Sequence, residues 1–300
     1  MSKKNNKTFT TRFNHIVASF FVLVIIAFPV YATARWATDV IIGTDPRSLQ
    51  TLPEFNQRDA DKSQSKIEPF KEPVITITFD DGWRSISASG MPIMQKYGIT
   101  STQYILGDEF SNIAYLSEDQ VRDMQSHNHE IASHSLTHPN LTQLNKDDLY
   151  GEIVGSKEAL EKRFDQDVAD FASPLGAQND TTIDMISQYY RSQRNTEADP
   201  ETIGDEDINV TQNFDRYNII AYTVRQSTTI SDIVALTEYA QVHDGWLVLT
   251  YHQIEDVDSE YGIAPQNFEE HMKYIYDKPI RLANIGEVLN AVKEQAVVEW

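Results

Sequence analysis

The chain contains no cysteine among its 300 residues. This absence excludes disulfide bonds, thiolate metal ligands, cysteine nucleophiles and lipid attachment through a cysteine. Basic residues are also scarce: 25 lysines and arginines stand against 45 aspartates and glutamates, and the formal net charge is −20. Binding to nucleic-acid phosphates or to anionic lipid needs clustered positive charge, which this composition does not favour. The sequence therefore predicts a solvated acidic surface and no nucleic-acid partner.

Long apolar runs are rare as well, and the main one lies near the N-terminus, over residues 16–32. Several lysines and an arginine precede it, and Ala32-Thr33-Ala34 at its end fits a signal-peptidase cleavage pattern. The run is long for a signal-peptide core and short for a membrane span. Either interpretation exports the remaining chain, because the positive end stays inside. A buried core helix is less favoured, since the run does not alternate with polar residues.

We therefore predict a signal peptide or signal anchor over residues 1–34. The protein would be extracytoplasmic, either secreted or anchored to the cell membrane, with membrane contact only through this segment. A linker is expected over residues 35–72, because this stretch is polar, contains scattered prolines and shows no periodicity.

From residue 73 onwards, short β-branched runs alternate with amphipathic helical patterns. Strands are expected at residues 74–79, 102–106, 130–133, 219–224 and 246–251, and helices at residues 146–164, 230–242, 268–276 and 285–296. A further helix should begin at Ser117, which fits a capping box with Gln120. Such alternation is typical of parallel βα units. The sequence predicts one α/β domain over residues 73–300, a (β/α) barrel of about seven strands.

Acidic and histidine side chains follow three of the expected strands. Asp80 and Asp81 come directly after the first strand, where an aspartate pair more commonly caps a turn or helix. His134 and His138 follow the third strand with a spacing that can place both rings on one cation, although two hydrogen-bonded polar histidines are the competing interpretation. His252 follows a later strand. Because barrel active sites lie at the carboxyl ends of the strands, all these side chains can meet there.

Three motifs together resemble the polysaccharide deacetylase (NodB homology) family, carbohydrate esterase family 4, over about residues 73–292. They are Thr78-Phe79-Asp80-Asp81-Gly82, His134-Ser135-Leu136-Thr137-His138 and Leu249-Thr250-Tyr251-His252. The resemblance implies a distorted (β/α) barrel and a hydrolase that acts on carbon–nitrogen but not peptide bonds. Its substrate would be an N-acetylated glycan such as peptidoglycan, a chitin-like oligomer or an exopolysaccharide. A divalent metal, usually zinc, would activate the attacking water, and we expect a monomer.

The resemblance also implies roles for single residues. Asp80 would be the catalytic base and His252 the catalytic acid. The metal ligands would be Asp81, His134 and His138.

A pocket for the acetyl group is implied in the same way. The segment Phe171-Ala172-Ser173-Pro174-Leu175-Gly176 resembles the family's third motif. Pro174 and the backbone N–H of Leu175 would belong to the oxyanion pocket, and Leu249 would line the space for the acetyl methyl group.

The chain departs from the family pattern at two places. Ala172 stands where the family often has an arginine that pairs with the base, and we predict that Arg194 replaces it, with Arg225 as the next candidate. The family's fourth motif is not recognisable, so no residue is assigned to orient His252. These departures leave open an inactive membrane-tethered glycan-binding protein. Two further alternatives keep the same site and change the bond: an O-acetyl esterase acting on xylan-type glycans, or a non-sugar amidase.

Overall fold

The computed structural model describes residues 72–196, 204, 207–210 and 214–297. The expected signal or anchor segment, and the linker up to residue 71, lie outside these ranges. In the part of the chain that is described, no helix combines the length and the apolar character that crossing a bilayer requires.

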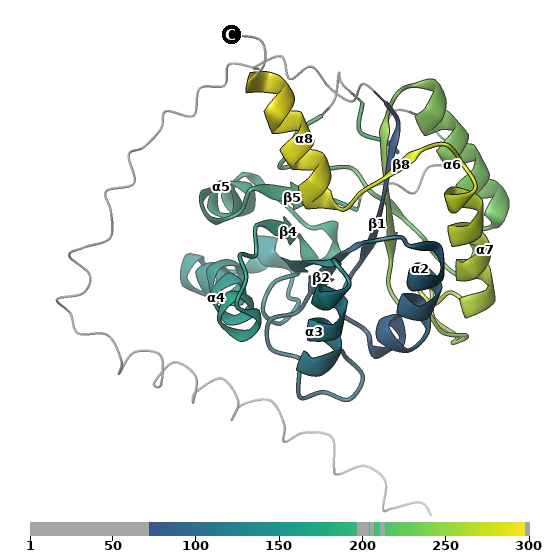
Figure 1. Cartoon of the computed structure of the whole chain (residues 1–300). Helices are drawn as coiled ribbons and strands as arrows, with labels where there is room; N and C mark the ends of the chain where they lie inside the picture. Colours follow the sequence, from purple (N-terminus) through teal and green to yellow (C-terminus); the bar gives the residue numbers. More distant parts are fainter. Residues whose placement is uncertain (1–71, 197–203, 205–206, 211–213, 298–300) are drawn as a thin grey trace, which may run out of the picture. The chain divides into compact units, whose positions relative to one another are not determined.

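The centre of the molecule is a curled parallel sheet (Figure 1). Its order is β5-β4-β3-β2-β1-β7-β6, and the short β8 pairs beside β1. The strands are β1 (Val74–Phe79), β2 (Thr102–Ile105), β3 (Glu130–Ser133), β4 (Asp170–Ala172), β5 (Ser192–Arg194), β6 (Tyr222–Thr223), β7 (Trp246–Tyr251) and β8 (Arg281–Leu282). Backbone hydrogen bonds from Ile219 to Gln193 and from Asn195 to Ile219 bring the chain before β6 against β5. The predicted distorted (β/α) barrel is confirmed.

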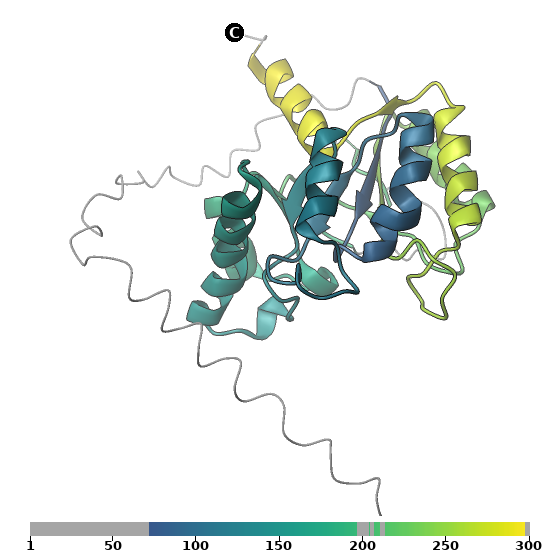
Figure 2. The same ribbon diagram turned by 60° about the horizontal axis from the view of Figure 1, so that its bottom comes forward.

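Helices surround this sheet, as Figures 1 and 2 show. They are α2 (Met91–Tyr97), α3 (Glu118–Ser126), α4 (Lys146–Phe164), α5 (Asp180–Tyr189), α6 (Ile230–Val242), α7 (Pro265–Tyr276) and α8 (Ile285–Val297), with shorter turns η2 (Ile86–Gly90), η3 (Leu141–Gln143) and η4 (Pro174–Gly176). The capping box predicted at Ser117 is present, with both of its reciprocal hydrogen bonds to Gln120.

Alternation along β1 and β7 separates two hydrophobic clusters, because successive side chains point to opposite faces of a strand. Ile75, Ile77 and Phe79 of β1 pack in the larger cluster, together with residues of the surrounding helices. Val74 lies in the smaller cluster inside the barrel, where α8 packs. Asp80 continues the inward-facing series at the carboxyl end of β1. The alternation of side chains along β1 therefore places the Asp80 carboxylate inside the barrel, at the carboxyl ends of the strands.

At the opposite end of the barrel, a cluster of polar side chains contacts the start of α8. Glu130, at the start of β3, accepts hydrogen bonds from the backbone N–H of Gly286 at 3.0 Å and from the hydroxyl of Thr102 at 2.7 Å. Arg191 lies 3.3 Å from Glu130 and also pairs with Asp170. Burial and the nearby Asp170 raise the pKa of Glu130. This cluster fixes the start of α8 at the amino ends of the strands. The candidate site lies at the carboxyl ends, on the other side of the barrel.

Candidate active site

A buried ion pair occupies the middle of the barrel mouth. Asp80 follows β1, Arg194 ends β5, and both side chains are almost fully buried. Arg194 Nη2 lies 2.6 Å from each carboxylate oxygen of Asp80. Burial alone would raise the pKa of Asp80, but the charges of Arg194, His134 and His252 outweigh it and lower that pKa. Asp80 is therefore ionised. It contacts Arg194, the arginine that was predicted from the sequence to pair with it.

The position of this arginine explains the unusual Ala172. In the β4–β5 pairing, Ala172 lies directly beside Arg194, so both face the barrel interior. The guanidinium group also lies over the ring of Tyr104, 4.9 Å from its centroid. The arginine reaches the base from the neighbouring strand, and a small side chain at position 172 leaves it room. Arg225, the second candidate, instead pairs with Glu260 at 3.1 Å.

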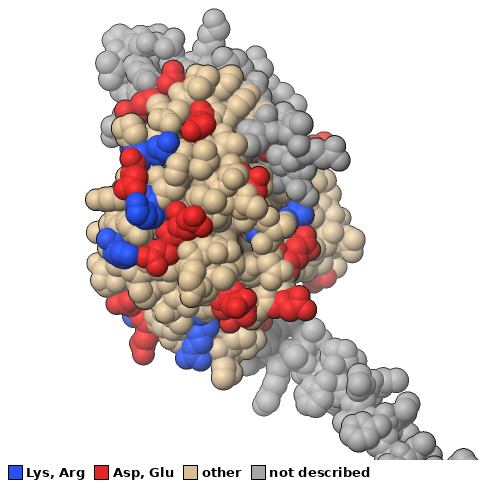
Figure 3. Space-filling view, turned by 90° about the vertical axis from the view of Figure 1, so that its right-hand side faces the viewer, with Lys and Arg blue, Asp and Glu red and all other residues tan. Residues whose placement is uncertain are grey.

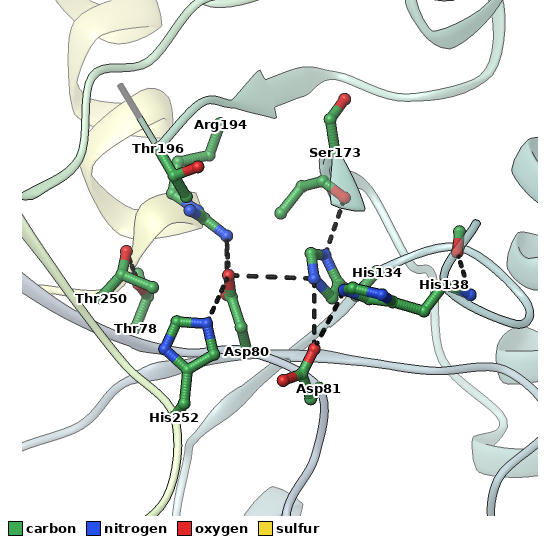
Figure 4. Close-up of polar contacts among 12 residues, drawn as sticks. Thr78, Asp80, Asp81, His134, His138, Ser173, Arg194, Thr196, Thr250 and His252 are labelled. Atoms are coloured by element: carbon green, nitrogen blue, oxygen red, sulfur yellow. Dashed lines mark hydrogen bonds and ion pairs between the residues drawn. The ribbon is translucent and has the colours of Figure 1, made fainter. Parts of the chain in front are cut away.

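Next to this pair, Asp81, His134 and His138 converge (Figure 4). Asp81 Oδ1 lies 3.5 Å from His134 Nε2 and 3.3 Å from His138 Nε2. Among the described residues, these three form the one group whose ligand atoms all lie within 4.8 Å of one another. Two imidazoles and a carboxylate are the donor set of a catalytic zinc site, which keeps a further position open.

The protonation of these groups also suits a cation. His134 Nδ1 lies 2.9 Å from the carbonyl oxygen of Ala172, which can only accept. Nδ1 therefore carries the hydrogen, and Nε2 presents its lone pair to the site. Burial lowers the pKa of His134, although Asp80 and Asp81 oppose this, and so favours the neutral imidazole that a metal needs. Asp81 Oδ1 is buried and has no hydrogen-bond partner in the described part of the chain. The residues fit a divalent metal.

The backbone around the site is strained. Seven non-glycine residues in the described ranges have positive φ, a region that costs most side chains energy. Four of them belong to the site: Asp81, Ser135, His138 and Leu175, with φ between 60° and 68°. The other three are Asn128, Asp165 and Asp244. Asparagine, aspartate and histidine tolerate this conformation better than other residues, so the strain is greatest at Ser135 and Leu175, both in the site.

A carboxylate on α4 holds the strained histidine loop in place. Glu152 Oε2 accepts the backbone N–H groups of Leu136 and Thr137 at 3.0 and 2.9 Å, and its Oε1 accepts the Thr137 hydroxyl at 2.6 Å. Within the loop, the N–H of His138 donates to Ser135 Oγ at 3.0 Å. No sequence motif pointed to Glu152. Nor did one point to Trp83, whose indole N–H donates to Asp81 Oδ2 at 2.8 Å.

His252 lies on the other side of Asp80, directly after β7. Its Nε2 is 3.9 Å from Asp80 Oδ2, close enough for both groups to contact one substrate atom but too long for a hydrogen bond. The ring lies against Tyr261, with centroids 4.9 Å apart. His252 Nδ1 is buried and has no hydrogen-bond partner among the residues that the structure describes. The residue that orients this histidine stays unassigned.

The prediction for Leu249 is wrong. Leu249 is fully buried in the larger cluster, beside Ile77 of β1, on the face of the sheet that packs against the helices. The next residue, Thr250, faces the interior, where its hydroxyl lies 2.9 Å from that of Thr78. Because side chains alternate along β7, Leu249 cannot reach the same side as His252.

The third motif follows the carboxyl end of β4. Pro174 is buried, whereas the Leu175 side chain is 66% exposed. Leu175 adopts a left-handed conformation, with φ 60° and ψ 12°. The role of the Leu175 backbone N–H in holding an oxyanion stays a prediction.

Two further histidines are structural. His129 accepts or shares hydrogen bonds with Ser101, and His271 lies 3.2 Å from the Tyr251 hydroxyl. Burial lowers the pKa of each to about 4, so both stay neutral in the folded protein.

Comparisons with known proteins agree with this geometry. Residues 67–191 match the family model described as Polysaccharide deacetylase. YxkH of Bacillus subtilis, which is named as a polysaccharide deacetylase, is 30% identical over 112 residues, 37% of this chain and 40% of that protein. A poly-β-1,6-N-acetyl-D-glucosamine N-deacetylase of Staphylococcus aureus is 27% identical over 135 residues, 40% of this chain and 46% of that protein. The chain thus spans less than half the length of these curated relatives.

A solved structure shows the same fold. The Xyl-CE4 domain of a multidomain xylanase from the hindgut metagenome of Trinervitermes trinervoides superposes with a TM-score of 0.52 and 20% identity. The match covers 73% of this chain and 91% of that domain. At this identity the likeness concerns the fold alone.

Proposed function

We propose that this chain, whose residues 67–191 match the model of the polysaccharide deacetylase family, is a hydrolase that removes N-acetyl groups from an extracytoplasmic glycan. One observation carries the proposal. A buried, ionised Asp80 lies between Arg194 and His252, directly beside a set of three residues that fits a divalent metal.

Asp80 acts as the base. The lowered pKa keeps its carboxylate ready to accept the proton of an attacking water at neutral pH. Arg194 maintains this charge, because its Nη2 contacts both oxygens of the carboxylate. Proton acceptance by a positioned side chain typically contributes about 10²–10⁴-fold to the rate.

Asp81, His134 and His138 hold the metal, which we expect to be zinc. When bound, the metal supplies Lewis-acid polarisation and lowers the pKa of water towards about 7. On the other side, the backbone N–H of Leu175 stabilises the negative charge that develops on the acetyl oxygen. Removing one such donor typically costs about 3 kcal/mol. The left-handed turn at Leu175, formed at some cost in strain, supports this role.

His252 acts as the acid. An amine leaves poorly unless it is protonated, and a histidine 3.9 Å from the base can deliver a proton to the same reacting centre. Because Nε2 faces Asp80, Nε2 is the nitrogen that transfers the proton.

The remaining expectations concern location and partners. The basic and apolar N-terminal segment supports export, with the protein secreted or anchored by that segment. The face drawn in Figure 3 has acidic and basic side chains interspersed, without a continuous basic patch, which is consistent with a neutral glycan rather than nucleic acid as the partner. We expect a monomer.

Acetate release tests the proposal. The purified protein should liberate acetate and expose new amines on at least one of three substrates: an N-acetylglucosamine oligomer, peptidoglycan or a β-1,6-linked N-acetylglucosamine polymer. Acetate from acetylated xylan without new amines would instead show an O-acetyl esterase, and acetate only from small non-sugar amides would show an amidase. Glycan binding with no acetate from any substrate would show the inactive binding protein.

A further inference from the structure

The two carboxylate oxygens of Asp81 have different partners. Oδ2 accepts the indole N–H of Trp83 at 2.8 Å. Oδ1 faces His134 and His138 at 3.5 and 3.3 Å and has no hydrogen-bond partner in the described residues. One oxygen is therefore fixed by a neutral donor, while the other is left to the two imidazoles.

Trp83 is itself held by a neighbouring loop. Its ring stacks on that of Tyr115, with centroids 4.8 Å apart and an angle of 21° between the planes. An isolated antiparallel bridge joins the same two residues. Backbone hydrogen bonds from Leu116 to Gly82 at 2.8 Å and from Arg84 to Ala114 at 2.9 Å lie on either side of it. The indole is thus locked in plane and position by a loop that contributes no ligand.

We propose that Trp83 is a positioning residue for the metal: its N–H fixes the rotation of the Asp81 carboxylate so that Oδ1 stays with the two histidines. This inference rests on the metal site of the proposed function. Asp81 is already in a left-handed conformation at φ 67°, and among the described residues the indole N–H supplies the hydrogen bond to its carboxylate. Without the indole N–H, the carboxylate can rotate and present either oxygen to the two histidines. Metal binding must then supply the free energy that orders it.

The indole N–H also has an effect that opposes metal binding. A hydrogen bond to Oδ2 withdraws some charge from the carboxylate, so removing it makes Asp81 a slightly better electron donor. Measured substitutions of groups that orient metal ligands nevertheless cost roughly 10–100-fold in affinity or activity. We therefore expect the loss of carboxylate positioning to lower zinc affinity more than the gain in basicity raises it.

The test compares Trp83→Phe with Tyr115→Phe in the full-length chain. Trp83→Phe keeps an aromatic ring against Tyr115 but removes the N–H donor. Tyr115→Phe keeps the stack and removes only a hydroxyl. Zinc affinity is measured by competition with a chromophoric chelator, which does not depend on activity. We expect zinc affinity to fall about 10–100-fold in Trp83→Phe and by less than threefold in Tyr115→Phe.

Two further readouts separate positioning from a general structural role. The melting temperature of the metal-free Trp83→Phe protein should stay near that of wild type. Its kcat should recover at excess zinc with KM for glycan unchanged, because the defect lies in metal occupancy. If Trp83→Phe does not fold, Trp83→Met is used, since methionine fills irregular apolar space without donating.

The outcomes distinguish the two proposals. Wild-type zinc affinity in Trp83→Phe overturns the positioning role and leaves the proposed function intact. An equal loss in both variants also overturns it, because the stacking rather than the N–H would then matter. A wild-type protein that binds no zinc overturns this inference and the metal site of the proposed function together.

Discussion

The buried pair between Asp80 and Arg194 allows a quantitative prediction. Arg194→Ala removes a guanidinium group that lies 2.6 Å from both carboxylate oxygens. With charges about 4 Å apart and an effective dielectric constant near 20, the lost attraction is roughly 4 kcal/mol. Burial, which already opposes ionisation of Asp80, is then less well compensated. We therefore expect the pKa of Asp80 to rise.

The direction of the effect on rate follows from the role of the base. Asp80 must be ionised to accept a proton, so a higher pKa moves the acid limb of the pH–rate profile towards alkaline pH. Activity should be lost first at low pH and recover partly as pH rises. Breaking a buried pair also leaves an uncompensated charge, which typically costs about 3–5 kcal/mol of stability. The variant should therefore melt earlier as well.

The assay is acetate release against pH with the metal in excess, next to thermal melts at the same pH values. Arg191→Ala is the matched control, because Arg191 pairs with Asp170 at the opposite end of the barrel. It should lower the melting temperature without moving the acid limb. A second variant, Arg194→Ala with Ala172→Arg, moves the arginine to the adjacent strand position and should restore part of the shift. An Arg194→Ala enzyme with an unmoved acid limb would refute the reasoning.

Three further predictions follow. Asp80→Asn and His252→Ala should each lower turnover by about 10²–10⁴-fold while elemental analysis finds metal retained; loss of metal from Asp80→Asn would show that the base is a ligand. Glu152→Ala should release the histidine loop and lower zinc affinity in chelator competition about tenfold, and an unchanged affinity would show that the loop holds itself. Burial lowers the pKa of His129 from 6.5 to about 4, so the unfolded chain takes up this proton before the folded protein does as the pH falls. The folded state therefore loses at most about 3 kcal/mol of stability between pH 6.5 and pH 4. The melting temperature of His129→Asn should depend less on pH in this range than that of wild type, and an equal dependence would contradict this.

The long elements of the fold could be predicted from the sequence because their patterns are unambiguous. The β-branched run of β1, the capping box before α3 and the amphipathic pattern of α4 all lie where expected. Strands β4, β5 and β8 have only two or three residues, too few for a period to show. In β5 the buried residues are Ser, Gln and Arg, which chain composition alone would assign to the surface.

The site could be predicted in part, for a related reason. Ala172 left the base without its expected cation, which directed attention to Arg194, and the structure places that arginine on Asp80. Leu249 was assigned from the resemblance of Leu249-Thr250-Tyr251-His252 to a family motif, although an odd separation in a strand puts two side chains on opposite faces. Trp83 and Glu152 act through loops with positive φ, whose path the sequence does not reveal.

The central claim is that Asp80 and a metal held by Asp81, His134 and His138 together remove acetyl groups from a glycan. The most direct test measures acetate and metal in the same samples of purified protein with an N-acetylglucosamine oligomer. The account predicts acetate release that rises with zinc up to one equivalent per chain, disappears on chelation, returns on zinc addition, and is lost in Asp80→Asn at full metal content. Undiminished acetate release from fully chelated protein would contradict it.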